Sequence, residues 1–151
     1  MAQSATVHAS AVLVGARAVL IRGPSGSGKS QLAREFIAMR GREFVFTRLV
    51  GDDRVHLEAV NGRLLVSPAA ALAGLLEVRG VGLMRLDHEP SAVVGLVVDL
   101  AAADAERLPE PERRHIEIDG IVLPRLAVAA GAAALPAVLG HLTLDRQTEQ
   151  L

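Results

Sequence analysis

The segment Gly23–Ser30 reads GPSGSGKS and fits the pattern G-x-x-x-x-G-K-[ST] of a Walker A phosphate loop, or P-loop. Glycines let such a loop turn its N–H groups toward phosphate oxygens, while the lysine reaches the outer phosphates and the last hydroxyl ligates Mg²⁺. A short apolar run, Ala18–Arg22, precedes the loop, and helix formers follow over Gln31–Met39. The strand, loop and helix in this order predict an α/β domain. The predicted nucleotide-binding residues are Gly23, Pro24, Ser25, Gly26, Ser27, Gly28, Lys29 and Ser30.

Composition narrows the classes of partner. The 151 residues are enough for one ordinary domain, and 16 basic against 17 acidic side chains leave a net charge of -1. The nearly neutral charge excludes a strong overall electrostatic attraction to nucleic acids or acidic membranes, and 2% aromatic residues argue against stacking platforms for single-stranded nucleic acid, so neither partner is expected. It has no cysteine, no secretory leader and no apolar run of 18 residues, so we expect a cytoplasmic protein. Lys29 is the one lysine among the 16 cationic side chains.

The rest of the chain predicts a mixed β-sheet flanked by helices. Asn61–Gly62 and Asp119–Gly120 are strong hairpin turns, so part of the sheet is antiparallel. The helix after the loop is expected over Gln31–Met39, with Gly41 as its C-terminal cap. Predicted strands are Thr6–Val14, Ala18–Arg22, Phe44–Val50, Val55–Val60, Arg63–Val66, Ala92–Leu100, His115–Ile118 and Ile121–Leu123. Further expectations are a short helix over Pro68–Leu75, a loop or strand edge over Leu76–Gly82, a loop or short helix over Ala101–Arg114, and a final helix over Ala132–Leu142 interrupted near Pro136.

Two candidate carboxylate sites lie at the ends of predicted strands. Asp52 and Asp53 follow Phe44–Val50, where a base or a Mg²⁺-binding carboxylate is expected, and adjacent carboxylates can face opposite sides. Asp99 follows the apolar run Val94–Val98 and has the position of a Walker B aspartate. The pattern of residues leaves both assignments open.

Three ordered motifs and one spaced histidine resemble the catalytic domain of HPr kinase/phosphorylase. After the phosphate loop come GDDRV at Gly51–Val55 and LEVRGVGL at Leu76–Leu83, and His8 stands fifteen residues before Gly23. The resemblance covers residues 8–124 and is closest to the shortened alphaproteobacterial form. It implies one HPr kinase/PEP carboxykinase-like P-loop domain over residues 1–151, without an N-terminal regulatory domain.

The resemblance also implies an activity and roles for individual residues. The family uses ATP or pyrophosphate, with Mg²⁺, to phosphorylate a serine of the carrier protein HPr. It removes that phosphate by phosphorolysis and regulates the bacterial phosphotransferase system. Carried onto this chain, the implied catalytic residues are His8, Lys29, Asp53 as the base and Arg107; the implied metal ligands are Ser30 and Glu77; the supporting residues are Asp52, Arg79, Gly80 and Gly82. Taken singly, Glu77 and Arg79 also fit a surface ion pair, and His8 fits a structural histidine.

One region departs from the family pattern. The family has an arginine-rich stretch near its C-terminus, where this chain has the alanine-rich segment Arg125–Gly131, expected to be helix-like. Phosphorylase activity and assembly into a homo-oligomer are therefore left open. Two other functions also fit the loop: a kinase for a small molecule, and a nucleotide-sensing module without catalysis. A protein serine kinase acting on HPr is the prediction that the motifs favour.

Overall fold

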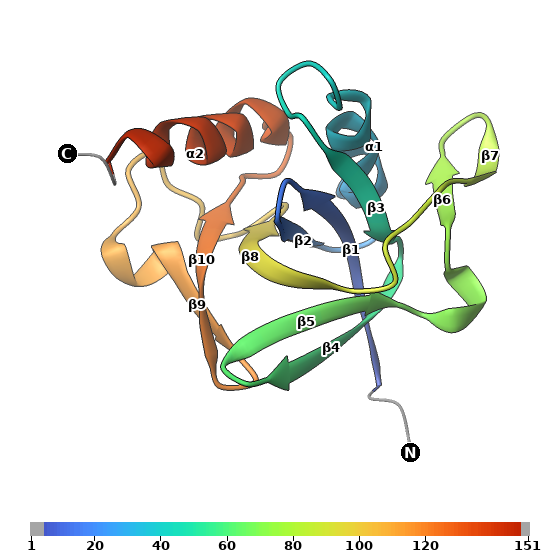
Figure 1. Ribbon diagram of the computed structural model, residues 1–151. Helices are drawn as coiled ribbons and strands as arrows, with labels where there is room; N and C mark the ends of the chain where they lie inside the picture. Colours follow the sequence, from blue (N-terminus) through green and yellow to red (C-terminus); the bar gives the residue numbers. More distant parts are fainter. Residues whose placement is uncertain (1–4, 149–151) are drawn as a thin grey trace.

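The computed structural model of the chain describes residues 5–148 and contains one large sheet, a two-stranded ribbon and two α-helices (Figure 1). In chain order the elements are β1 (Thr6–Val14), β2 (Arg17–Arg22), α1 (Lys29–Ala38), β3 (Thr47–Gly51), β4 (Arg54–Val60), β5 (Arg63–Pro68), the 3-10 turn η1 (Ala70–Leu72), β6 (Leu75–Val78), β7 (Gly82–Arg85), β8 (Ala92–Asp99), the 3-10 turn η2 (Pro111–Arg114), β9 (His115–Ile118), β10 (Ile121–Ala127) and α2 (Ala134–Thr148).

The large sheet is mixed, as predicted. β8 lies parallel to both β2 and β10, and the other pairings are antiparallel. Pairings of β1 with β4, β4 with β5, β5 with β8, β8 with β2 and β2 with β1 close a ring. One edge of β1 pairs with two strands in succession. Its first part, Thr6–His8, pairs with β4, and its last part, Ala11–Val14, pairs with β3. The chain between β3 and β4 is therefore held at the middle of β1.

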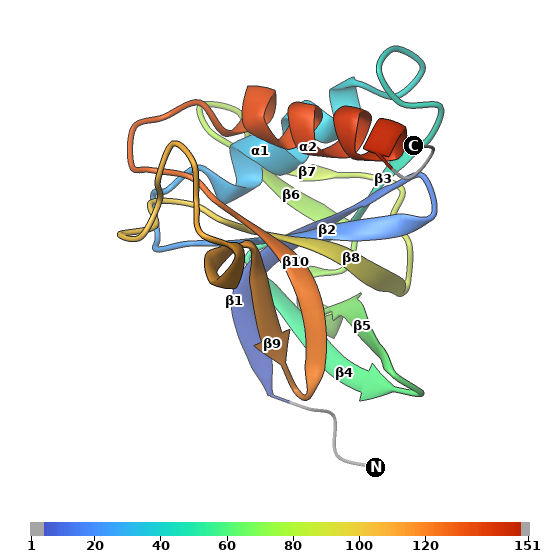
Figure 2. The same cartoon turned by 90° about the vertical axis from the view of Figure 1, so that its left-hand side faces the viewer.

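Both helices cover the same face of the sheet (Figure 2). One hydrophobic cluster joins them to the sheet and includes Phe36 of α1, Val138 of α2 and Val98 of β8. A second cluster fills the inside of the ring, where Leu20 and Leu64 are fully buried. The prediction of flanking helices is therefore correct for one face, while strands cover the other. Within the described residues, no helix is long and apolar enough to cross a membrane.

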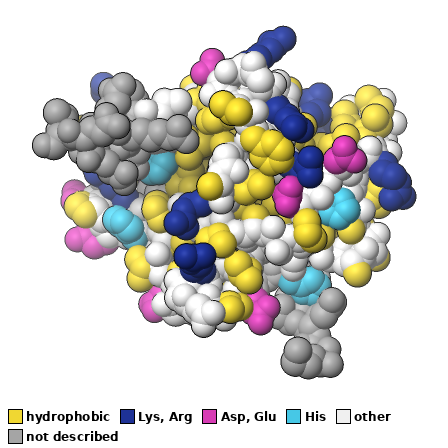
Figure 3. All heavy atoms as spheres, viewed as in Figure 1, with side chains coloured by type: hydrophobic (Ala, Val, Ile, Leu, Met, Phe, Trp, Pro, Cys, Tyr) yellow, Lys and Arg dark blue, Asp and Glu magenta, His cyan; other side chains and the backbone are white. Residues whose placement is uncertain are grey.

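The face shown in Figure 3 carries basic and acidic side chains scattered among apolar ones, as the nearly neutral composition indicates. Apolar side chains gather at its upper right, where the ribbon of β6 and β7 lies in Figure 1. The exposed apolar residues of this ribbon are Val81, Leu83 and Met84. The ribbon therefore extends away from the core, except at its root.

Most predicted elements are present, with corrections at their ends. Both hairpins form, and their central residues have positive φ, as type I′ turns require. The strand predicted from Phe44 begins only at Thr47, and α1 ends at Ala38, one residue before the predicted end at Met39. Gly41, the predicted cap, has a positive φ of 80°. The final helix is not interrupted at Pro136, because this residue lies in the first turn of α2, where no backbone hydrogen bond is lost.

Two further segments differ from the expectation. Leu76–Gly82, expected to be a loop or strand edge, contributes to the antiparallel ribbon in which Glu77 pairs with Leu83. The chain after Leu123 does not turn into a helix-like tail: β10 continues through Ala127 because it pairs with β9 on one side and β8 on the other. Tertiary pairing overrides the weak local propensity in both cases.

Candidate functional site

Residues 23–28 form a tight loop between β2 and α1, and Lys29 and Ser30 begin α1, as the motif predicts. Gly26 and Gly28 have φ values of 81° and 100°, which few residues other than glycine adopt without strain. Lys29 begins α1 and is only 7% exposed, and its Nζ donates to the carbonyl oxygens of Gly23 and Pro24 at 2.7 and 3.0 Å. Desolvation lowers the pKa of Lys29, against the opposing attraction of two nearby aspartates. The ammonium is thus held against the inside of the loop.

The inner surface of the loop fits phosphate groups. The hydroxyl oxygen of Ser27 is buried and has no hydrogen-bond partner within the described structure. A Cβ at Gly23 would lie 2.5 Å from this oxygen and 3.1 Å from the carbonyl oxygen of Leu100, so only glycine leaves the space open. Because an unpartnered buried hydroxyl is costly, a ligand oxygen that accepts from it would be favoured.

Asp52 is a buried carboxylate that joins three elements. Its side chain is 4% exposed and accepts hydrogen bonds from the Ser10 hydroxyl at 2.6 Å and the Ser30 hydroxyl at 2.8 Å. It also accepts the backbone N–H of Glu77 at 3.2 Å. Asp52 therefore holds the last residue of the phosphate loop to β1 and to the root of the ribbon.

Asp53 faces a different environment although it is the next residue. It adopts a left-handed conformation, with φ at 68°, and its side chain is 61% exposed. The ring nitrogen Nε2 of His8 donates to its Oδ1 at 3.0 Å. The change of partner on β1, from β3 to β4, lets the chain turn here, so one carboxylate points into the core and the other toward solvent.

A cleft of about 300 Å³ brings most of the predicted site residues together. One side is the phosphate loop with Lys29 and Ser30. The other predicted residues that line it are His8, Asp53, Glu77 and Arg79. Ser30 and Glu77 supply oxygen donors of the kind that Mg²⁺ prefers, in a site where a few protein oxygens complement phosphates and water. The cleft thus combines groups of the kinds that can bind phosphate and a metal ion with an exposed carboxylate.

The ribbon of β6 and β7 forms the wall of this cleft opposite the phosphate loop. Leu76 is 1% exposed and anchors β6 in the core beside α1, so the following residue, Glu77, is fixed close to the loop. The turn between the two strands contains Gly80 and Gly82, with φ values of 83° and 112°. Their positive φ angles are the reason that glycine is needed in this turn.

Asp99 lies apart from this cleft. Its carboxylate accepts from Arg22 at 2.7 and 2.8 Å and from Nε of Arg125 at 2.6 Å. Burial alone would raise the pKa of Asp99, but the hydrogen bonds from the two arginines outweigh it and lower that pKa. The described structure therefore brings Asp52 to Ser30 and pairs Asp99 with arginines. Arg107 is exposed between β8 and η2 and does not line the cleft.

Two residues at the site, Ser10 and Arg34, and one residue away from it, Arg125, were not predicted from the sequence. Ser10 lies two residues after His8, and period two on a strand places both on one face. Arg34 lines the cleft four residues after Ser30, which is the spacing of neighbours on one side of a helix. Both could have been found from these spacings. Arg125 gives no such local signal, because its partners come from β8 and the segment after it.

Comparison with known proteins places the chain in a family. A family model for the HPr Serine kinase C-terminal domain matches residues 1–130. HPr kinase/phosphorylase of Streptococcus thermophilus is 33% identical over 139 residues, covering 85% of this chain and 43% of the relative. The Neisseria meningitidis protein of the same name is 33% identical over 130 residues, covering 82% and 38%. The chain therefore spans about two fifths of the length of these curated relatives.

A solved structure shows the same fold. The Hpr(Ser) kinase/phosphatase from Coxiella burnetii superposes with a TM-score of 0.74 at 23% identity, covering 97% of this chain and 93% of that one. At this identity the likeness concerns the fold, whereas the family match rests on the sequence of most of the chain. The chain belongs to the HPr serine kinase C-terminal domain family.

Proposed function

We propose that this chain is an ATP- and Mg²⁺-dependent protein serine kinase that phosphorylates an HPr-type phosphocarrier protein, on a P-loop domain of the HPr kinase/PEP carboxykinase type. The observation that carries the proposal is the single cleft in which the phosphate loop, Asp53 and Glu77 meet. The names of the curated relatives point to the same acceptor protein. A role in regulating a phosphotransferase system is part of the proposal.

The loop and its neighbours bind and orient the donor. Backbone N–H groups of the loop and the Lys29 ammonium hold the outer phosphates of ATP, once Lys29 exchanges its carbonyl partners for phosphate oxygens. Ser30 and Glu77 would hold Mg²⁺, which supplies charge neutralisation at the phosphates when bound. Arg34 and Arg79 line the same cleft and add positive charge. Among arginines, these two are better placed for this task than Arg107.

Asp53 acts on the acceptor. Its exposed carboxylate takes the proton of the serine hydroxyl while that oxygen bonds to the γ-phosphorus, and the bond from this phosphorus to the bridging oxygen of ADP breaks. Phosphoserine and ADP result, and the proton stays on Asp53 until it passes to solvent. If the chain also dephosphorylates by phosphorolysis, the bond from the phosphoserine oxygen to phosphorus breaks as inorganic phosphate attacks that phosphorus, protonated Asp53 returns its proton to the serine oxygen, and pyrophosphate is the product.

Two neighbouring side chains position the proposed base and the proposed metal ligands. His8 holds Asp53 through the 3.0 Å hydrogen bond, which limits the orientations of an otherwise exposed side chain. Asp52 holds Ser30 and the backbone of Glu77, so the two proposed metal ligands are fixed to one buried carboxylate. Phosphoryl transfer depends chiefly on positioning and charge neutralisation, which is what these contacts provide.

The test measures both phosphoryl transfer to HPr and the affinity for ATP. Purified protein is incubated with HPr, Mg²⁺ and ATP labelled at the γ-phosphate, and ATP affinity is measured separately by calorimetry. We expect label on HPr, none on an HPr whose acceptor serine is alanine, and a loss of at least about 100-fold in rate for Asp53→Asn with ATP affinity retained. Asp87→Asn, an exposed aspartate outside the cleft, is the matched control.

Other outcomes separate the alternatives. Label that reaches HPr undiminished in Asp53→Asn would remove Asp53 from the reaction. ATP binding with no transfer to HPr would support the non-catalytic sensor, and transfer to a metabolite in the absence of HPr would support the small-molecule kinase.

A further inference from the structure

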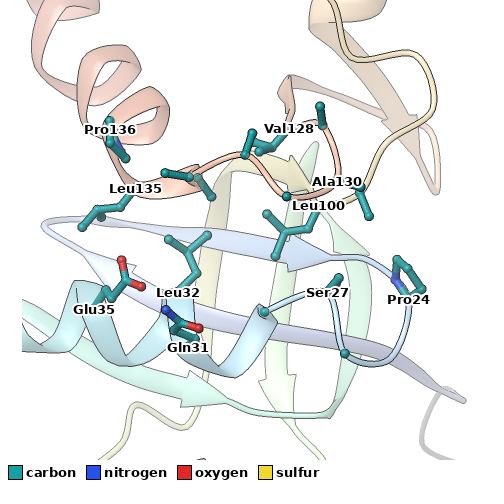
Figure 4. A pocket seen from close by; sticks show the side chains of 18 of the residues that line it. Pro24, Ser27, Gln31, Leu32, Glu35, Leu100, Val128, Ala130, Leu135 and Pro136 are labelled. Atoms are coloured by element: carbon teal, nitrogen blue, oxygen red, sulfur yellow. The ribbon is translucent and has the colours of Figure 1, made fainter.

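The two aspartates Asp52 and Asp53 lie on one side of the phosphate loop. On the other side is a larger cleft of about 610 Å³, between α1 and the segment that leads from β10 into α2 (Figure 4). Among the described residues that line this larger cleft, none is an aspartate and none belongs to β1 or β3. The groups that orient the two aspartates are found on the opposite side of the loop, where β1 meets the chain between β3 and β4.

Three consecutive residues of β1 hold Asp53. The ring of His8 donates to its carboxylate at 3.0 Å, and the backbone N–H of Ala9 donates to its carbonyl oxygen at 3.2 Å. The hydroxyl oxygen of Ser10 accepts the backbone N–H of Asp53 at 3.4 Å. Asp53 has a left-handed backbone, with φ at 68°, and a residue other than glycine keeps this conformation only where its surroundings hold it. β1 therefore stabilises the turn that exposes the Asp53 carboxylate.

The same Ser10 hydroxyl also holds Asp52. It is fully buried and donates to Oδ1 of Asp52 at 2.6 Å. Because a hydroxyl has one hydrogen to donate and lone pairs to accept, it can make this contact and the contact with the Asp53 N–H at the same time. Ser30 donates to the two oxygens of the same Asp52 carboxylate, at 2.8 and 2.9 Å. Ser10 thus hydrogen-bonds to both aspartates, to the carboxylate of one and to the backbone of the other.

We propose that Ser10 is a positioning residue of the phosphoryl transfer, which deepens the proposed function and rests on it. Through Asp52 it fixes the hydroxyl of Ser30, a proposed ligand of Mg²⁺. Through the backbone of Asp53 it fixes the proposed base. Ser10 itself is buried and does not line the catalytic cleft, so it acts only through these neighbours. One hydroxyl on β1 therefore sets where the metal side and the acceptor side of the site lie relative to each other.

Loss of this hydroxyl should disturb both sides. Asp52 would keep its bonds from Ser30 and from the N–H of Glu77, but would lose the shortest of its hydrogen bonds. A hydrogen bond to a charged group changes an equilibrium by about tenfold or more. The N–H of Asp53 would lose its acceptor, which frees the left-handed turn. Since transfer requires the reacting atoms to lie about 3–3.5 Å apart, small shifts of either side lower the rate.

The experiment compares side chains with and without a hydroxyl on this part of β1. Ser10→Ala removes the hydroxyl. Ser10→Thr and Ser10→Val form a pair of closely similar shape, both branched at Cβ, in which only the threonine has a hydroxyl. Thr47→Val is the matched control, because it removes another buried hydroxyl, one that donates to the carbonyl oxygen of Ile37 outside the cleft. Calorimetry measures ATP affinity with Mg²⁺ and with the metal chelated, and labelled ATP measures transfer to HPr.

We expect Ser10→Ala to weaken binding of Mg²⁺-ATP by about fivefold or more, with affinity for metal-free ATP within about twofold of the unsubstituted chain. For transfer to HPr, kcat should fall by about tenfold or more and KM for HPr should change by less than about twofold, because Ser10 does not line the cleft. Ser10→Thr should exceed Ser10→Val in both Mg²⁺-ATP affinity and kcat. Thr47→Val should lower the urea midpoint and leave these values unchanged.

Three results would overturn the inference and leave the proposed function in place. The first is a folded Ser10→Ala protein whose Mg²⁺-ATP affinity and kcat lie within about twofold of the unsubstituted chain. The second, decisive if Ser10→Ala does not fold, is equal values for Ser10→Thr and Ser10→Val. The third is an equal loss of affinity for ATP with and without metal, which would mean a general loosening of the fold. No transfer to HPr by the unsubstituted chain would refute the proposed function itself, and the inference with it.

Discussion

Replacing Asp99 by asparagine should destabilise the protein and leave its phosphate loop able to bind ATP. The Asp99 carboxylate is 14% exposed and receives three short hydrogen bonds from Arg22 and Arg125. The two arginines come from β2 and β10, which lie on either side of β8. Asp99 thus joins the ends of three strands, although it makes no contact with the loop hydroxyl that Asp52 holds.

The free energy of unfolding that Asp99→Asn loses depends on which partners Arg22 and Arg125 keep. Removing one partner of a buried ion pair costs about 3–5 kcal/mol, and each hydrogen bond to a charged group contributes about 1.5–3 kcal/mol. Arg125 keeps its two bonds to Asp104, and the Arg22 side chain is 32% exposed and can be hydrated. Asparagine also retains one acceptor oxygen. We therefore expect the free energy of unfolding to fall by about 3 kcal/mol, the lower limit of the range for a broken buried ion pair. For a chain of this length this corresponds to a decrease of about 6–12 °C in Tm.

Circular dichroism during urea unfolding measures this change, since the chain has neither tryptophan nor tyrosine for fluorescence. Calorimetry with Mg²⁺-ATP is run on the same samples at a temperature where both proteins are folded. Asp119→Asn, a turn residue at an exposed hairpin, is a suitable control because asparagine tolerates the same positive φ.

A loss of less than about 1 kcal/mol would refute the reasoning about the buried ion pair. A stable Asp99→Asn protein that no longer binds Mg²⁺-ATP would refute the assignment of the carboxylates, and would restore Asp99 as the Walker B-type residue of the site.

Three further perturbations test the core, the loop and the dependence on pH. Phe36→Ala should cost about 3–5 kcal/mol in urea unfolding, because this ring is fully buried between α1 and the sheet. Gly23→Ala should cost about 1–3 kcal/mol and weaken pyrophosphate binding in calorimetry, because its Cβ would clash with Ser27 and crowd the Leu100 backbone. Because the pKa of Asp99 is lower in the folded protein than its usual 3.8, its stabilisation is complete above that value and is lost as the pH falls through the folded-state pKa; urea unfolding of Asp99→Asn should show a weaker acid dependence.

Local chemistry made much of the fold predictable. The turns at Asn61–Gly62 and Asp119–Gly120 carry their own conformational preference, and the phosphate loop determines that a helix follows a strand. β3 begins later than predicted, and the apolar residue Phe46 before it contacts the guanidinium groups of Arg40 and Arg48, at 4.6 and 5.2 Å from the centre of its ring. Such contacts depend on the tertiary fold and leave no periodic signal.

The site was predictable as a set of residues but less so as a geometry. Motif order placed Asp52 and Asp53 near the loop, yet their division into a buried and an exposed carboxylate depends on the positive φ of Asp53. Likewise, the pairing of Asp99 with arginines requires β10 to continue past Pro124, where local propensity indicates a strand end. Both features are set by strand pairing across the sheet.

The parallel pairing of β2 with β8 has a consequence for the order in which the protein folds. It joins Arg22 to Asp99, 77 residues apart, and anchors the first residue of the phosphate loop only when this distant partner is in place. Contacts between residues so far apart in sequence form slowly, because the entropy of closing a long loop is lost before the contact contributes any stabilisation. The hairpins should form first, and the capacity to bind ATP should appear only in the last phase of refolding, so that nucleotide selects molecules whose sheet is complete.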